Sequence, residues 1–265
     1  MNRRLIIGMI MIVILGLFAC KQKAADTPGG ETEQGSNTFA PLPSFKDVYS
    51  ALDQIKVRDI SAAVPSSVYQ TRQEEVRNAF SLGLLTADAV LAAKGRDKGK
   101  LSDISAQMMN LTSLLGLESE VNRLGDEMKT MIEREDWENL DKALDFHKAD
   151  VENKLWESEN FDNYTLMLLG GWIEAANRVA WLIHEDYNAD RSRVLAQKGT
   201  FNSLVSNLEE ISTPHIVDQE AFQEAKKLTK EVQAIIQSHD SSGFSKVQLQ
   251  EIITKTDEIK AAFQK

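Results

Sequence analysis

The chain contains few of the residues and motifs on which familiar enzyme chemistry depends. Cys20 is the single cysteine among 265 residues, so no disulfide can form within the chain and no paired-cysteine haem or zinc motif occurs. There is no G-x-S-x-G nucleophile motif and no phosphate-binding glycine loop. The stretch "HEDYN" (184–188) lacks the second histidine of an H-E-x-x-H zinc site. These absences predict a protein that is not an enzyme and has no cofactor.

A metal-dependent enzyme is the weakest of the alternatives that remain. His147 and Asp150 are separated by three residues, so on a helix they would share a face and offer two metal ligands. No third ligand accompanies them in the sequence, and a zinc site needs at least three protein ligands. We therefore expect no metal site and interpret His147 as a surface or core histidine.

Basic residues are also scarce relative to acidic ones. The chain has 30 Lys and Arg against 40 Asp and Glu. Without Arg3 and Arg4 of the N-terminal segment, 28 basic residues stand against 40 acidic ones, a net charge of −12. No basic stripe with interleaved aromatic residues is present, and an acidic surface repels phosphate groups. The sequence predicts no nucleic-acid partner.

The N-terminus has the order of a signal peptide. Arg3 and Arg4 provide a positive charge, and the apolar run "LIIGMIMIVILGLFA" (5–19) follows. This run is shorter than the roughly 20 residues that span a bilayer comfortably. An uncleaved transmembrane anchor is the alternative interpretation.

The end of the apolar run, "LFAC" (17–20), resembles the lipobox of bacterial lipoproteins. The resemblance implies that residues 1–19 are removed and that Cys20 becomes the acylated first residue, held in a membrane by several acyl chains. In Gram-negative lipoproteins an aspartate after the cysteine favours the inner membrane. Lys21 occupies that position here, so the resemblance implies the outer membrane, with the protein facing the periplasm.

The segment that follows Cys20 has the composition of a flexible tether. Residues 20–43 are rich in Gly, Pro, Ser, Thr, Glu and Gln and contain almost nothing that a core would bury. From residue 44 the apolar pattern becomes dense and continues to residue 265. About 220 residues suffice for one domain with a sizeable core. A division into two helical halves, about 44–158 and 159–265, is the alternative.

The apolar residues of the domain recur at helical spacing. Leu101, Ile104, Met108 and Leu111 form one such stripe, and similar stripes follow to the C-terminus. No stretch alternates at period two. Ser245 and Gln248 precede the last stripe as a capping box. The sequence predicts an all-α fold.

Two predicted helices differ from the others because they are apolar on nearly every side. They are "AFSLGLLTADAVLAA" (79–93) and "TLMLLGGWIEAANRVAWLI" (165–183). A helix of this kind is buried or crosses a membrane, and the charged residues within both segments disfavour a bilayer. We expect two central buried helices sheathed by amphipathic helices in a multi-helix bundle. Glycines within both segments indicate that the two helices cross closely.

The central segments contain the candidate site. Asp88 lies on the first, and Glu174 and Arg178 are placed on the second at i, i+4, where they can pair. One interpretation is a ligand pocket with tryptophan walls. The other is a polar network that satisfies itself and fixes the packing of the helices. The candidate ligand-binding residues are Asp88, Trp172, Glu174, Asn177, Arg178 and Trp181.

The chain as a whole resembles the class of all-helical bacterial envelope lipoproteins, a likeness that transfers no site residues. Two functions follow as hypotheses. The first is a membrane-anchored, periplasm-facing interaction or structural module that binds an envelope protein partner and contacts the lipid membrane through acylated Cys20. The second is a small-ligand-binding lipoprotein that uses a polar pocket between the central helices.

Overall fold

The computed structural model describes residues 49, 60–65, 69, 71–239 and 242–264. Helices are the only regular secondary structure in these residues, which confirms the predicted all-α class. The predicted signal peptide, Cys20 and the tether lie outside the described residues. The helices, in chain order, are η1 (Ile60–Ala63), α2 (Glu75–Lys94), α3 (Lys98–Leu114), α4 (Glu118–Arg134), α5 (Trp137–Glu157), α6 (Phe161–Glu185), α7 (Ala189–Ser192), η2 (Arg193–Leu195), α8 (Lys198–Glu210), α9 (Pro214–Val217), α10 (Glu220–Ser238) and α11 (Lys246–Gln264).

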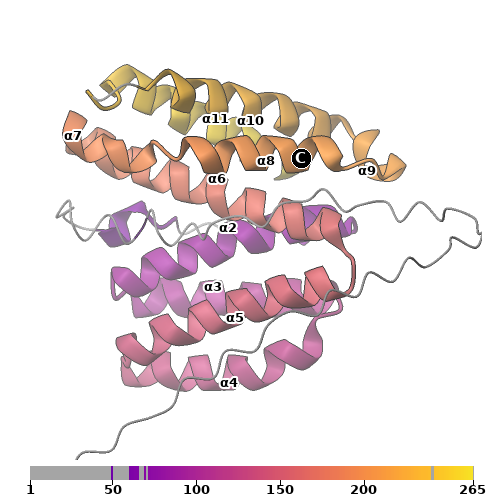
Figure 1. The fold of residues 1–265 in the computed structure, drawn as a ribbon. Helices are drawn as coiled ribbons and strands as arrows, with labels where there is room; N and C mark the ends of the chain where they lie inside the picture. The colour runs from indigo at the N-terminus through magenta and orange to yellow at the C-terminus, as the bar shows by residue number, and fades with distance from the viewer. Residues whose placement is uncertain (1–48, 50–59, 66–68, 70, 240–241, 265) are drawn as a thin grey trace, which may run out of the picture. The chain divides into compact units, whose positions relative to one another are not determined.

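Helices α2 and α6 form the centre of the bundle and pack against each other (Figure 1). They correspond to the two segments that are apolar on nearly every side. Both have the length and hydropathy of a membrane span, but 94% and 89% of their most apolar stretches are buried inside the protein. Other helices of the same chain therefore cover the surfaces that a bilayer would cover in a membrane protein.

The remaining long helices cover this central pair on both sides. Helices α3, α4 and α5 follow one another in space, with α3 and α5 packed on α2. On the other side α11 packs on α6 and α10, while α8 contacts α10 and α6 (Figure 1). The predicted arrangement of two central helices sheathed by amphipathic ones is confirmed. The division of the chain into two helical halves stays a prediction.

Glycines allow the backbones of α2 and α6 to touch. A Cβ atom on Gly83 would lie 2.0 Å from the carbonyl oxygen of Met167, and one on Gly170 would lie 2.1 Å from that of Phe80. Both distances are far below van der Waals contact, and the atoms met are backbone atoms that cannot rotate away. The predicted close crossing of the two central helices is therefore confirmed. It brings the polar residues of α2 and α6 within reach of one another.

Helix α11 begins at the predicted capping box. The backbone N–H of Gln248 donates to Ser245 Oγ at 3.2 Å, and the backbone N–H of Ser245 donates to Gln248 Oε1 at 2.9 Å. Two backbone donors that the helix leaves unpaired are satisfied in this way. The cap fixes where α11 starts, and α11 supplies a charged residue to the interior.

Candidate functional site

The polar residues of the central helices form one buried ionic network, with Glu174 at its centre. The Glu174 side chain is completely buried on α6. Its Oε1 pairs with Arg178, one helical turn further on, and its Oε2 lies 3.0 Å from Lys260 Nζ of α11. Neither oxygen forms a hydrogen bond of regular geometry. Arg178 and Lys260 therefore hold the carboxylate through close electrostatic contact. The ion pair with Lys260 joins α6 to α11.

Asp88 connects the network to α2. Its side chain is 1% exposed, and Arg178 Nε donates to its Oδ1 at 3.4 Å. The hydroxyl of Tyr69 donates to its Oδ2 at 3.2 Å. Arg178 thus pairs with carboxylates from both central helices. The sequence predicted that Asp88, Glu174 and Arg178 come together, and the structure places them in contact.

Asn177 extends the network to the protein surface along α11. Its Nδ2 donates to Thr256 Oγ1 at 2.8 Å and to Asp257 Oδ1 at 3.0 Å, while its Oδ1 accepts from Arg178 Nη1 at 3.2 Å. Asp257 also lies 2.9 Å from Lys260 Nζ, and its side chain is 56% exposed. A continuous chain of polar contacts therefore runs from the buried carboxylate of Glu174 to solvent at Asp257.

The charges of the network alter the acidity of its members. Burial raises the pKa of Asp88 because it disfavours the charged form, and the neighbouring Glu174 carboxylate raises it further. Burial also opposes ionisation of Glu174, but Lys260 and Arg178 outweigh it and lower the pKa of this carboxyl. The two pKa values are therefore shifted in opposite directions, upward for Asp88 and downward for Glu174.

Arg178 keeps its charge in this setting. Burial opposes the charged form, but the adjacent Glu174 and Asp88 carboxylates overcome it and raise the pKa of the guanidinium. Burial also raises the pKa of Tyr69, so its phenol remains a hydrogen-bond donor to Asp88. The buried part of the network thus carries two carboxyls and two cations, and each group faces a partner of suitable chemistry. Such closed networks fix how helices pack.

The two tryptophans of the predicted pocket lie in different surroundings. Trp172 is 1% exposed and meets Phe201 of α8 edge-to-face, with ring centroids 6.3 Å apart. It is two positions from Glu174 on α6, so the two side chains leave the helix on opposite sides. Trp181 is partly buried and packs against the hydrophobic core. A ligand pocket walled by both tryptophans stays a prediction.

The sequence analysis missed Lys260, Asp257 and Thr256 of α11. A signal for Lys260 was present in the sequence. Lys260 lies four residues after Thr256 and three residues before Phe263. This spacing places the lysine on the apolar face of the last helix. A lysine on a buried face needs a carboxylate partner. The sequence did not show that this partner is Glu174, which lies on a different helix.

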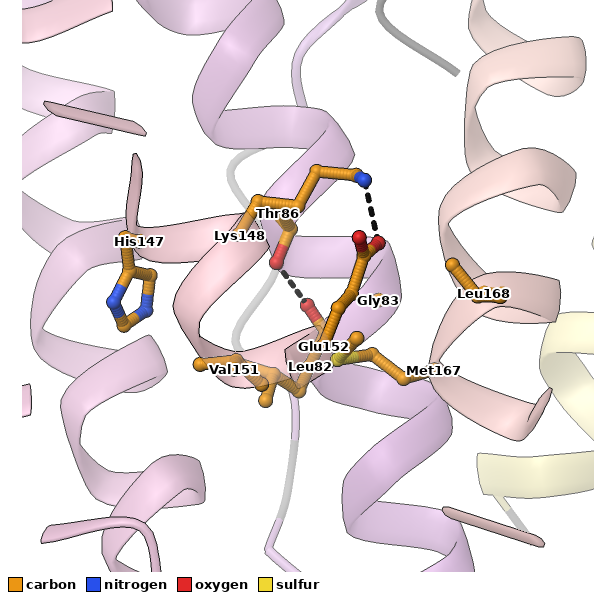
Figure 2. Close-up of a pocket in the computed structure, with 9 residues that line it drawn as sticks. All are labelled: Leu82, Gly83, Thr86, His147, Lys148, Val151, Glu152, Met167 and Leu168. Carbon is orange, nitrogen blue, oxygen red and sulfur yellow. Dashed lines mark hydrogen bonds and ion pairs between the residues drawn. The ribbon is translucent and has the colours of Figure 1, made fainter. Parts of the chain in front are cut away.

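A pocket lies away from the network, between α2, α5 and α6. Figure 2 shows Lys148 and Glu152, one turn apart on α5, paired at its edge with their charged atoms 2.5 Å apart. The space open to the centre of a water-sized sphere is about 10 Å³, which is room for one water. It cannot hold a ligand of several atoms. The pocket is lined by Leu82, Gly83, Thr86, His147, Lys148, Val151, Glu152, Met167 and Leu168.

No group of three or more His, Cys, Asp and Glu side chains is placed to hold a metal ion within the described part of the chain. His184 contacts the neighbouring Glu185 at 3.5 Å, and Asp150 acts electrostatically on His147. The fold and the network together define an all-α bundle whose central helices are tied by a buried ionic network. Comparison with protein-family models, with curated proteins and with solved structures finds no significant match.

Proposed function

We propose that the chain is a lipid-anchored helical module of the bacterial cell envelope that acts by binding another envelope protein. In this proposal Cys20 carries the acyl chains, residues 20–43 are the tether, and the helical domain faces the periplasm from the outer membrane. The "LFAC" sequence, with Lys21 after it, supports the anchor and its location. The composition of residues 20–43 supports the tether.

The pairing of the buried charges is the observation that carries the binding role. A pocket for a small ligand needs polar groups that remain free for the ligand. Asp88, Glu174 and Arg178 instead engage one another, Tyr69 and Lys260. The network therefore supports a structural role for the candidate site. In this proposal the partner protein binds to the outer surface of the domain.

The same geometry argues against catalysis at this site. A general acid or base must come within hydrogen-bond reach of its substrate. Glu174 is fully buried and Asp88 is 1% exposed, and the closely packed central helices lie around them. With so little exposed surface, neither carboxyl is open to a substrate. This supports a binding protein over an enzyme.

The anchor is tested by changing the two residues at the predicted cleavage site. Intact mass measurement of the purified protein should show residues 1–19 removed and acyl groups on Cys20. Cys20→Ala should abolish both changes. Lys21→Asp should move the protein from the outer-membrane to the inner-membrane fraction. An unmodified Cys20 in a chain that retains residues 1–19 would instead identify an uncleaved anchor.

The binding role is tested by native mass spectrometry of the full-length protein extracted from its own membranes. We expect a protein-sized partner whose retention is the same in wild type, Glu174→Gln and Asn177→Ala. Circular dichroism should first confirm that each variant is folded. A co-purifying small molecule that is lost in both variants would refute the proposal and identify the network as a ligand site.

A further inference from the structure

A second pocket lies between α3, α4 and α5, and His147 lines both this pocket and the one in Figure 2. The space open to the centre of a water-sized sphere is about 20 Å³, enough for a water or a single ion. Its lining is unusually rich in sulfur. The lining residues are Ser105, Met108, Met109, Gly125, Met128 and His147.

His147, which lines this pocket, has an unpaired ring nitrogen. The side chain is 5% exposed, and its Nδ1 has no hydrogen-bond partner. The buried Oγ of Ser105 also has none. Leaving a buried polar atom unpaired is unfavourable, so such atoms are rare without a bound water, an ion or a function. An imidazole ring nitrogen is the side-chain group that most often binds metals.

Three thioethers accompany the imidazole. Met108 and Met128 are 3% and 5% exposed, while Met109 is 38% exposed. Gly125 makes room for Met109, because a Cβ at this position would lie 2.9 Å from the Met109 sulfur. Glycine inside a helix is less favourable than alanine. Gly125 thus leaves free the space that the Met109 thioether occupies.

We infer that Met108, Met109, Met128 and His147 form a binding site for one soft monovalent metal ion of the Cu(I) type. Thioether and imidazole are the donors that Cu(I) prefers, whereas Mg²⁺ and Ca²⁺ require oxygen ligands. Zn²⁺ sites use thiolate, imidazole and carboxylate, and the lining supplies only the imidazole.

The charge of the ion follows from the neutrality of the donors. Thioethers and a neutral imidazole add no negative charge to balance a cation in the interior. Burying a divalent ion would cost about four times as much as burying a monovalent one, because the Born energy grows with the square of the charge. This site does not depend on the proposed partner-binding role.

The site is tested by anaerobic titration of the full-length protein with Cu(I) in competition with a coloured chelator. We expect one bound ion, and Ag(I), a soft ion of the same charge, should show the same stoichiometry by native mass spectrometry. Met108→Leu and Met128→Leu nearly conserve side-chain volume, so the fold should persist. Each should weaken binding at least about tenfold, since even the outer partners of a metal site contribute that much.

Met167→Leu provides the matched control. Met167 is also a buried methionine, 6% exposed, but it lines the pocket on the other side of His147. Its replacement should leave the affinity unchanged. Any binding by Cys20 or by methionines outside the pocket is common to all variants and cancels in the comparison.

Gly125→Ala tests the site without removing a donor. The new methyl group should displace the Met109 thioether and weaken Cu(I) binding, while helix content stays the same. X-ray absorption of the bound ion should show sulfur neighbours together with one nitrogen that disappears in His147→Leu. If wild type binds no ion, or if Met128→Leu binds as tightly as wild type, the inference is wrong and the pocket holds only water.

Discussion

Gly83→Ala should destabilise the protein, although alanine is the better helix former. In an open helix this substitution stabilises by about 1 kcal/mol. At Gly83 the added Cβ would lie 2.0 Å from the Met167 carbonyl oxygen, and real Cβ atoms essentially never approach closer than 3.0 Å. The central helices must therefore separate by about 1 Å, the difference between these two distances.

The steric term should exceed the helix-propensity term. Overpacking of a well-packed core costs about 1–3 kcal/mol, and more where the obstacle is backbone that cannot rotate. Separating α2 from α6 also lengthens the contact between Asp88 and Arg178, which is already 3.4 Å. We expect the free energy of unfolding to fall by about 2 kcal/mol or more. Gly170→Ala meets the Phe80 carbonyl oxygen at 2.1 Å and should have a similar effect.

The assay is urea unfolding followed by far-ultraviolet circular dichroism. Gly99→Ala in α3 is the matched control, because the nearest atom to its Cβ would be an Asp97 side-chain oxygen at 3.7 Å. This variant should be as stable as wild type or up to about 1 kcal/mol more stable. The urea midpoint should fall for Gly83→Ala and stay level or rise for Gly99→Ala, at similar m-values. If Gly83→Ala were as stable as Gly99→Ala, the close backbone crossing would be refuted.

Three further predictions concern the network, the buried histidine and the helix cap. Arg178→Met removes the cation that contacts both Asp88 and Glu174 and should cost about 3–5 kcal/mol; if adding Asp88→Asn restored none of it, the pairing would be wrong. Burial lowers the pKa of His147 below its unfolded value of 6.5. Just below pH 6.5 the imidazole therefore takes up a proton in the unfolded chain but not in the folded one. Unfolding free energy should therefore fall as pH drops through that window, by up to about 1.4 kcal/mol per pH unit, and urea titrations of His147→Leu should lack this component. Equal slopes in both proteins would contradict it. Ser245→Ala removes the acceptor of the Gln248 N–H and should lower the thermal midpoint, at a cost of about 1 kcal/mol; an unchanged midpoint would show that the cap is dispensable.

Much of the fold was predictable because local patterns determined it. The period of the apolar residues predicted helices, and the absence of a polar face on two segments predicted that both are central. The glycines in these segments predicted close crossing, because a glycine in a helix interior needs a packing reason. Each of these predictions depends only on residues that are close to one another in the sequence.

The candidate site was predictable only in part, for the same reason. Glu174 and Arg178 were expected to pair because they lie one turn apart. Lys260 was missed because its partner lies on another helix. The pocket lined by Met108, Met128 and His147 was missed because these residues lie on three different helices. In the sequence each of them has the spacing of an ordinary core residue. The expectation of no metal site rested on histidine and carboxylate spacing and did not consider thioethers.

The amino-acid sequence is enough to predict the helical class, the two central helices and the need of Asp88, Glu174 and Arg178 for buried partners. Hydrophobic periodicity makes this possible, because it is a property of neighbouring residues and it indicates which helices are buried. The partners of the buried groups depend on tertiary packing. The ion pair between Glu174 and Lys260 joins residues from different helices. The pocket lined by His147 and three methionines does the same. Both therefore depend on how helices that are distant in the sequence pack together.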